Sequence, residues 1–362
     1  MIEYSVGDNM KILIVPDSFK GSLTSEEVCE CIRDGIHETD SGAEITTLPF
    51  ADGGEGFAVS MASICKGNIL YTNVHNIYGR PVKAPIVTFG KTAVIECAAA
   101  SGLLHRKDVM NATSYGTGEL IKFAVSRSFS NIILGLGGSG CCDGGAGALA
   151  ALGAVFYDEN YTKISIPKGK DINYIFGLNL RNIVKDINFI FACDVENEYC
   201  GKNGAAYVFA PQKGANEKQV EELDDGFKRL NAFLPNDISR VKGTGAAGGI
   251  CGGLYSVYGG EIKSGFDILA EYSLLEEKIK GADIIVTGEG KTDAQTLMGK
   301  LPYKISLLAK KHGKKCVIIS GSIDGARLGD KMISLVDENT TVDEAIKNAP
   351  SLLREKAKYI LQ

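Results

Sequence analysis

The sequence predicts an α/β protein in which short apolar strands lead into glycine-rich loops and then into helices. Residues 131–153 show the pattern: an apolar run at 132–134, a glycine loop at 135–145, and an alanine-rich run at 146–152 of helical composition. The same order of strand, polar loop and helix occurs near both ends of the chain. Such repeated units predict parallel strands joined by helices.

A change of pattern near residue 68 predicts the start of a second domain. Three short strands, at 68–74, 82–89 and 91–97, follow one another with only turns between them, which is typical of antiparallel sheet. The other predicted strands are 11–15, 44–48, 188–193, 283–287 and 316–319. The predicted helices are 25–37, 57–65, 119–126, 146–152, 217–234, 303–312 and 342–348, a small-residue helix entered from 243–249, and a tail helix that begins at Ser351.

Composition indicates a globular protein and argues against a nucleic-acid binder or a flexible linker. The chain has 362 residues, of which 44% are hydrophobic and 23% charged, as in an ordinary globular protein of one large or two ordinary domains. Its formal net charge of −5 argues against a general nucleic-acid binder. The 44 glycines are the outlier, and their clustering predicts many tight backbone sites rather than a flexible linker.

The ten cysteines form no CxxC pair, and most lie in apolar runs. They predict buried, reduced thiols rather than a disulfide or metal framework. The four histidines form no zinc-binding spacing. No signal peptide and no run of the ~20 apolar residues of a membrane-spanning helix is visible, so we expect a cytoplasmic protein without membrane contact. Residues 1–9 are expected to be an extension.

The glycine loop after the apolar run at 132–134 has the layout of a phosphate cradle, because backbone N–H groups and a helix N-terminus can face an anion there. Asp143 would repel a bare phosphate, which predicts a divalent cation between them. Glycine clusters also occur at tight turns and close helix–strand contacts without any ligand, and this alternative stays open. Gly290-Lys291-Thr292 is not a Walker A loop, since Val286 occupies the place of the leading glycine.

Acidic side chains recur at the ends of predicted strands or in glycine loops, and lysines are interleaved with them. The acids are Asp17, Asp52, Asp143, Asp194, Glu289 and Asp293, and the lysines are Lys20, Lys213 and Lys300. Metal-assisted phosphoryl transfer needs carboxylates for Mg²⁺, cations for phosphate charge and a carboxylate to accept a hydroxyl proton. Singly, Asp17 could stabilise a turn and Lys20 could be a solvated cation, but the whole set favours phosphoryl transfer.

Several motifs together resemble the bacterial glycerate kinase family, in the family's order and over residues 11 to about 322. They include VPDSFK at 15–20, ADGGEG at 51–56, AAASGL at 98–103, GTGEL at 116–120, GGS at 137–139, DGGAG at 143–147, ACDV at 192–195, PQKGA at 211–215, GAAGG at 245–249 and TGEG at 287–290. One departure is that Gly140-Cys141-Cys142 stands where the family usually has Ala-Thr-Asn.

The resemblance implies phosphorylation of D-glycerate by ATP and Mg²⁺, giving 2-phosphoglycerate or 3-phosphoglycerate. It implies a Rossmann-like parallel-sheet domain formed by both chain ends, residues 10–67 plus 283–362, and an inserted mixed α/β domain at 68–282. The partners would be small molecules, with a homodimer as one expectation for the assembly.

Roles for the matching residues follow from the resemblance as hypotheses. Gly137, Gly138, Ser139, Asp143 and Gly144 would hold the ATP phosphates. The remaining hypotheses are Asp194 or Asp293 as proton acceptor, Lys20 as a catalytic cation, Asp17 and Glu289 for Mg²⁺, and Asp17, Ser18, Asp52, Gly53, Gly54, Lys213 and Lys300 as substrate or ATP contacts.

Two alternatives remain. The first is a kinase of another small hydroxy acid on the same scaffold. The second is a non-catalytic nucleotide-binding sensor, which the Cys142 departure alone suggests.

Overall fold

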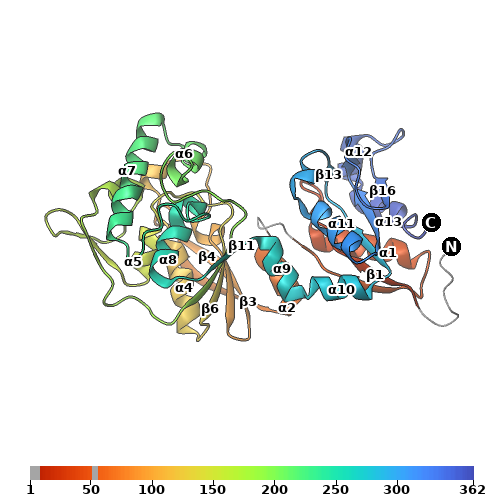
Figure 1. The fold of residues 1–362 in the computed structure, drawn as a ribbon, viewed down its shortest axis with the longest axis horizontal. Helices are drawn as coiled ribbons and strands as arrows, with labels where there is room; N and C mark the ends of the chain where they lie inside the picture. Colours follow the sequence, from red (N-terminus) through yellow and green to blue (C-terminus); the bar gives the residue numbers. More distant parts are fainter. Residues whose placement is uncertain (1–8, 51–55) are drawn as a thin grey trace. The chain divides into compact units, whose positions relative to one another are not determined.

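The computed structural model of the chain describes residues 9–50 and 56–362, which form two compact units (Figure 1). The terminal unit comprises residues 9–50, Ser63–Cys65 and Leu269–Gln362, so it is built from both ends of the chain. The central unit comprises residues 56–62 and Lys66–Ile268. The division between the units runs through helix α2 (Phe57–Cys65), whose last three residues belong to the terminal unit, and through helix α9 (Gly265–Ser273).

The terminal unit is organised around a five-stranded parallel sheet with the order β16-β14-β12-β1-β2. Its strands are β1 (Lys11–Ile14), β2 (Glu44–Thr47), β12 (Ile284–Thr287), β14 (Lys315–Ser320) and β16 (Lys331–Ser334). A short ladder of β13 (Lys291–Thr292) and β15 (Ser322–Ile323) accompanies this sheet. The helices are α1 (Ser25–His37), α10 (Leu275–Gly281), α11 (Leu301–Lys311), α12 (Val342–Lys347) and α13 (Ala349–Ala357).

Helix α1 forms as its sequence predicts. Thr24 caps it by accepting from the Glu27 N–H, and the Glu27 carboxylate accepts in return from the Thr24 N–H. Val28, Ile32 and Ile36 recur every four residues and are fully buried. The helix packs against α13 so closely that a Cβ on Gly35 would overlap the α13 backbone.

The central unit contains a six-stranded mixed sheet with the order β11-β10-β6-β5-β4-β3. Its strands are β3 (Asn68–His75), β4 (Pro81–Phe89), β5 (Thr92–Glu96), β6 (Asn131–Gly135), β10 (Asn188–Ala192) and β11 (Glu261–Lys263). The first three are antiparallel, and β5, β6, β10 and β11 are parallel. The predicted α/β class and the predicted change to antiparallel strands after residue 68 are therefore confirmed.

The helices of the central unit are α3 (Ala98–Ser101), α4 (Tyr115–Ser126), α5 (Ala146–Ala151), α6 (Ala205–Phe209), α7 (Glu217–Phe233) and α8 (Ile250–Tyr258). In addition, β7 (Val155–Tyr157) pairs with β8 (Lys163–Ile164) and β9 (Gly177–Asn179) in a small antiparallel sheet that the sequence did not predict.

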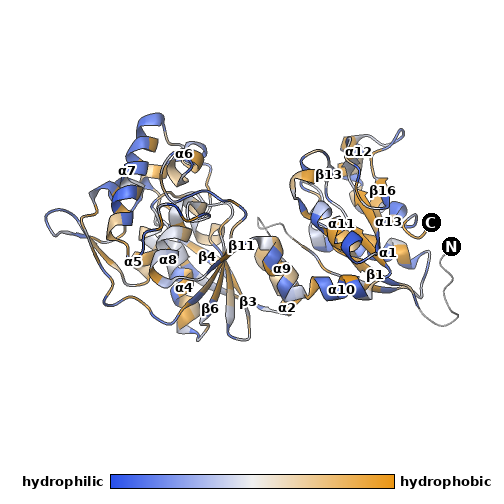
Figure 2. Cartoon of the chain, viewed as in Figure 1, coloured by the Kyte–Doolittle hydropathy of each residue, from blue (hydrophilic) through white to orange (hydrophobic). Residues whose placement is uncertain are grey.

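Figure 2 shows hydrophobic residues along the main sheets and a largely hydrophilic α7. Within the described residues, no helix is long and apolar enough to cross a membrane.

One predicted boundary is wrong for an instructive reason. The helix expected to begin at Glu119 begins at Tyr115, because Gly116 and Gly118 are helical. Glycine is a poor helix former, so its presence predicted a loop. Tertiary packing requires it here, since a Cβ on Gly116 would overlap the His75 carbonyl oxygen and one on Gly118 the Ala148 carbonyl oxygen.

Candidate active site

The carboxyl ends of the parallel strands of the central unit lie at one edge of the sheet. The strand register pairs Glu96 with Gly135, and Gly135 with Ala192. It also pairs Ala192 with Lys263 at the end of β11. The segments that follow these strands therefore start side by side, which is where ligands bind in parallel α/β folds.

The glycine loop after β6 presents Gly137 and Gly138 to solvent. Gly138 has φ of 71°, a left-handed conformation that favours glycine. Its carbonyl accepts from Leu103 N–H at 3.0 Å, which ties the loop to the segment after α3. Next to these exposed glycines, the Ser139 side chain turns inward.

Lys213 holds this loop from the protein side. It lies in the short 3₁₀ turn Pro211–Lys213 and is only 3% exposed. Its Nζ donates to Ser139 Oγ at 2.9 Å and to the Cys141 carbonyl oxygen at 2.8 Å. Two predicted site residues far apart in sequence, Ser139 and Lys213, are thus brought together, and a buried positive charge lies beneath a backbone suited to anions.

The Asp143 carboxylate is fully buried and faces the protein rather than solvent. Its Oδ2 accepts from Ser114 N–H at 2.7 Å, Ser114 Oγ at 2.8 Å and Gly147 N–H at 3.2 Å, and its Oδ1 accepts from Gly145 N–H at 3.2 Å. Burial raises the pKa of this carboxyl, and the hydrogen bonds from Ser114, Gly145 and Gly147 act in the opposite direction. The side chain joins the first turns of α4 and α5.

Gly144 is also buried, with φ of 65°, and its carbonyl accepts from Tyr199 Oη at 2.8 Å. A Cβ there would lie 2.5 Å from that hydroxyl oxygen. For Gly144, the geometry agrees with the alternative of close packing, whereas Gly137 and Gly138 are the exposed part of the loop.

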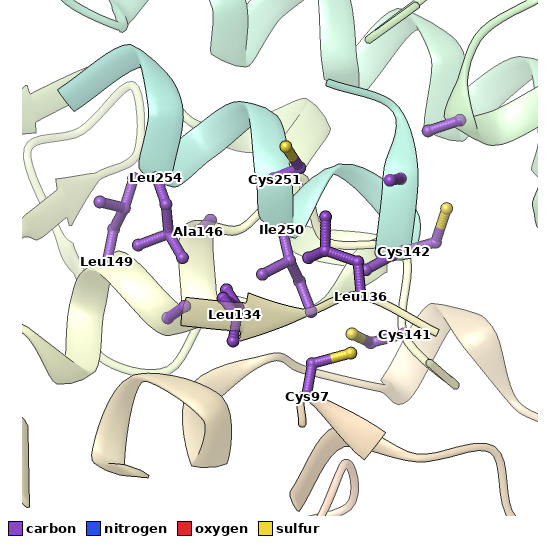
Figure 3. Packing of buried hydrophobic residues seen from close by; sticks show 14 of the residues in the cluster. Cys97, Leu134, Leu136, Cys141, Cys142, Ala146, Leu149, Ile250, Cys251 and Leu254 are labelled. Atoms are coloured by element: carbon purple, nitrogen blue, oxygen red, sulfur yellow. The ribbon is translucent and has the colours of Figure 1, made fainter. Parts of the chain in front are cut away.

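The cysteines that depart from the family pattern point into the core. Cys141 and Cys142 are fully buried, and Figure 3 shows the side chains of Cys97 and Cys141 pointing toward each other beneath Leu136. Burial raises the pKa of Cys142 to about 11 and that of Cys97 to about 12. Since the Cys142 side chain is enclosed, any ligand contact at this residue is left to the backbone.

Two further acids lie at the same sheet edge. Asp194 follows β10, is exposed, and accepts from Gly265 N–H at 3.1 Å at the start of α9. Glu96 ends β5, and its Oε1 accepts from Ala58 N–H at 2.9 Å in the first turn of α2. Glu96 falls near the end of the predicted strand 91–97, but nothing local predicts its partner in α2, which lies 38 residues away.

In the terminal unit, Asp17 and Glu289 follow the neighbouring strands β1 and β12. Asp17 N–H donates to the Gly288 carbonyl at 2.9 Å, which joins the two loops. The Asp17 Oδ1 accepts from Ser18 N–H at 2.7 Å. Asp17 and Ser18 are half-buried, so both predicted residues reach the surface at the carboxyl end of the sheet.

Glu289 is 5% exposed and lies among hydroxyl groups of its own loop. It accepts from Thr296 Oγ1 at 2.5 Å, and Lys300 Nζ lies 3.4 Å from its Oε2. The Thr292 hydroxyl lies 3.5 Å from Glu289 Oε1 and forms a hydrogen bond with Ser320 Oγ at 2.7 Å. The sequence identified Glu289 and Lys300 but not the threonines, which are too common in loops to be singled out.

The other predicted residues of this unit are more exposed. Asp293 accepts from Gln295 N–H at 2.9 Å, and this bond does most to lower its pKa. Lys291 Nζ lies 3.6 Å from Asp293, and Lys20 is exposed. Asp52, Gly53, Gly54 and residues 1–8 of the expected extension lie outside the described residues.

Across residues 9–50 and 56–362, no three acids, histidines or cysteines gather into a group able to hold a metal ion by themselves. Mg²⁺ in kinases is usually bound by one or two carboxylates together with substrate phosphates. The adjacent strand-end carboxylates Asp17 and Glu289 fit such a partial donor set, although Glu289 already has hydroxyl and lysine partners.

Two α/β units, each with charged groups at the carboxyl ends of parallel strands, define a protein of the ligand-binding α/β class. The model of the glycerate kinase family matches residues 12–362. The chain is 40% identical over 361 residues to the glycerate 2-kinase of Escherichia coli K12, with 94% of each chain covered. It is 37% identical to the glycerate kinase of Bacillus cereus, with 97% of each covered.

A crystal structure of a protein named as glycerate kinase 2 from Salmonella typhimurium LT2 has a TM-score of 0.88 and 37% identity, with 98% of this chain and 97% of that chain covered. The chain belongs to the glycerate kinase family, and it is therefore an enzyme of the kinase class. The resemblance stated from the sequence motifs is confirmed.

Proposed function

We propose that this enzyme transfers a phosphoryl group from ATP, with Mg²⁺, to a hydroxyl of D-glycerate. The observation that carries the proposal is the buried Lys213 ammonium held against Ser139, the residue that directly follows the exposed glycines 137 and 138. Burying an ammonium is costly, and two hydrogen bonds to oxygen atoms offset only part of that cost. A polyanion on the glycine loop supplies the missing negative charge.

In this proposal, the glycine loop and Lys213 bind phosphate oxygens of ATP. Lys213 stabilises the charge that spreads over the transferred group in the transition state, which fixed cations do well because they need no reorganisation. Asp143 holds the loop through its bonds to the starts of α4 and α5, and does not touch the ligand.

The acceptor hydroxyl must lose its proton as its oxygen bonds phosphorus and the bond to ADP breaks. Asp194 is the first candidate for the base, because it is exposed on the same sheet edge as the glycine loop. Asp293 is the second. The carboxylate that accepts the proton returns it to solvent after the product leaves.

Asp17 and Glu289 would hold the Mg²⁺, which supplies neutralisation of phosphate charge when bound. Lys20 and Lys300 contribute positive charge at the same loops, where they balance the phosphates or the glycerate carboxylate. Ser18 is a hydrogen-bond donor to the same ligand groups.

The test is a coupled assay of ADP release with D-glycerate, ATP and Mg²⁺, followed by enolase without phosphoglycerate mutase. The 2-phosphate is an enolase substrate and the 3-phosphate is not, so enolase turnover assigns the position. The name of the Escherichia coli relative favours the 2-phosphate. ADP release with another hydroxy acid but not with glycerate supports the alternative substrate class, and nucleotide binding without any turnover supports the sensor.

Lys213→Met should lower kcat by about 100-fold or more, as the loss of one transition-state contact does. Lys218→Met is the matched control, since Lys218 is an exposed lysine at the start of α7. If Lys213→Met keeps the normal rate while remaining folded, Lys213 has no part in the chemistry. Asn variants of Asp194 and Asp293 then decide between the two candidate bases.

A further inference from the structure

The outer edge of β3 has no role in the proposed function. β3 is the end strand of the six-stranded sheet, and among residues 9–50 and 56–362 only β4 pairs with it (Figure 1). It is eight residues long, and its sequence NILYTNVH contains no Asp, Glu, Lys, Arg or Pro. Proteins usually protect end strands with charged residues or proline, or by keeping the strands short.

The other end strands of the two main sheets are protected in the usual way. β2, β11 and β16 are four, three and four residues long, and each contains Lys or Glu. An unprotected edge of twice that length is therefore specific to β3.

The register shows which backbone groups of β3 point outward. Tyr71 lies opposite Pro85 and His75 opposite Pro81. Proline has no N–H, so both are non-hydrogen-bonded pairs, in which the backbone groups of β3 point away from β4. By alternation, Ile69 and Asn73 point the same way.

Part of this edge is already covered. The His75 N–H donates to Glu119 Oε2 of α4 at 2.8 Å. Ile69, Tyr71 and Asn73 therefore present the open stretch. Their side chains share the exposed face of the strand, where Ile69 is 48% and Tyr71 57% exposed.

We propose that β3 pairs with β3 of a second copy of this chain, antiparallel and about a two-fold axis at Tyr71. This register places Tyr71 opposite Tyr71 and Ile69 opposite Asn73, with both backbone hydrogen bonds exchanged in each pair. Every residue in the new ladder is uncharged, and the facing tyrosines form a favourable cross-strand aromatic pair. The two sheets join into one.

A second copy suits this edge better than another partner, because it offers the same row of outward groups at the matching spacing. Such an interface is isologous and closes with two chains rather than growing into a fibre. Lys83 of β4 lies beside Tyr71, with its Nζ 5.0 Å from the Tyr71 ring centroid. Its charge opposes the stacking of further chains on this face of the sheet. The inference does not depend on the proposed reaction.

Two variants test the edge in different ways. Tyr71→Lys places like charges opposite each other across the axis. Asn73→Pro removes an outward N–H but no bond of the β3–β4 ladder, because Asn73 does not donate to β4. Tyr174→Lys is the matched control, since Tyr174 is 60% exposed on the 3₁₀ segment Gly169–Tyr174.

Light scattering and sedimentation equilibrium over a concentration series measure the mass, with circular dichroism as a check of folding. The expected result is twice the mass of one chain for the natural sequence and for Tyr174→Lys, and an at least tenfold weaker association for Tyr71→Lys and Asn73→Pro. A single-chain mass for the natural protein overturns the proposal. So does unchanged association in both edge variants, or equal loss of association in the Tyr174→Lys control.

Discussion

Asp143→Asn isolates the contribution of the buried carboxylate that joins α4 and α5. The amide keeps the shape of the side chain but replaces one acceptor oxygen with an NH₂ group. The new side chain is accommodated best with its oxygen toward Thr113, Ser114 and Gly147, the side with four donors, which leaves its NH₂ facing the Gly145 N–H. That backbone donor is then buried without an acceptor.

The magnitude follows from these contacts. An unsatisfied buried N–H costs about 1–3 kcal/mol. The remaining bonds to the side-chain oxygen lose their ionic character, but the cost of burying a charge disappears as well, and burial is the largest influence on the Asp143 pKa. These two effects oppose each other, so we expect a net loss of about 2 kcal/mol, or roughly 4–8 °C in the melting temperature of a unit of this size.

The assay is differential scanning calorimetry, with far-UV circular dichroism in urea as a second measurement. Tryptophan fluorescence does not apply, since the chain has no tryptophan. Asp186→Asn is the control, because Asp186 is exposed and has φ of 60°, a conformation that asparagine tolerates well. Stability within about 0.5 kcal/mol of the natural protein, as expected for the control, would refute the structural role of Asp143.

Three further predictions concern local features. Thr24→Ala removes the cap of α1 and should cost about 1 kcal/mol in urea unfolding, and an unchanged midpoint would contradict the capping box. Hydrogen bonds from Lys311 and His312 lower the pKa of Glu276 from 4.5 to about 2, so the ion pair stabilises the fold above pH 4.5 and this stabilisation is lost as the pH falls through about 2. The difference in unfolding free energy between the natural protein and Glu276→Gln should vanish over that range, and a pH-independent difference would argue against the ion pair. Alkylation of the native protein at pH 8, followed by peptide mass mapping, should modify the half-exposed Cys65 and spare the buried Cys142, whose pKa is about 11. Modification of Cys142 would mean that the glycine loop after β6 opens.

The sequence alone determined most of the local structure, because local structure depends on near neighbours. The four-residue spacing of Val28, Ile32 and Ile36 and the threonine cap specify α1 within a single segment. The apolar runs of β1, β6 and β12 likewise specify buried parallel strands. The order of the glycine motifs was enough to identify the family.

Only the tertiary structure decided which residues that are distant in the chain come into contact. The sequence could not tell that Lys213 lies beneath Ser139, 74 residues away, or that the Asp143 carboxylate turns into the core to meet Ser114. It also could not tell that Gly116 and Gly118 serve helix packing rather than a loop. Intrinsic preferences amount to about 1 kcal/mol or less per residue, and burial and close packing across the fold outweigh them.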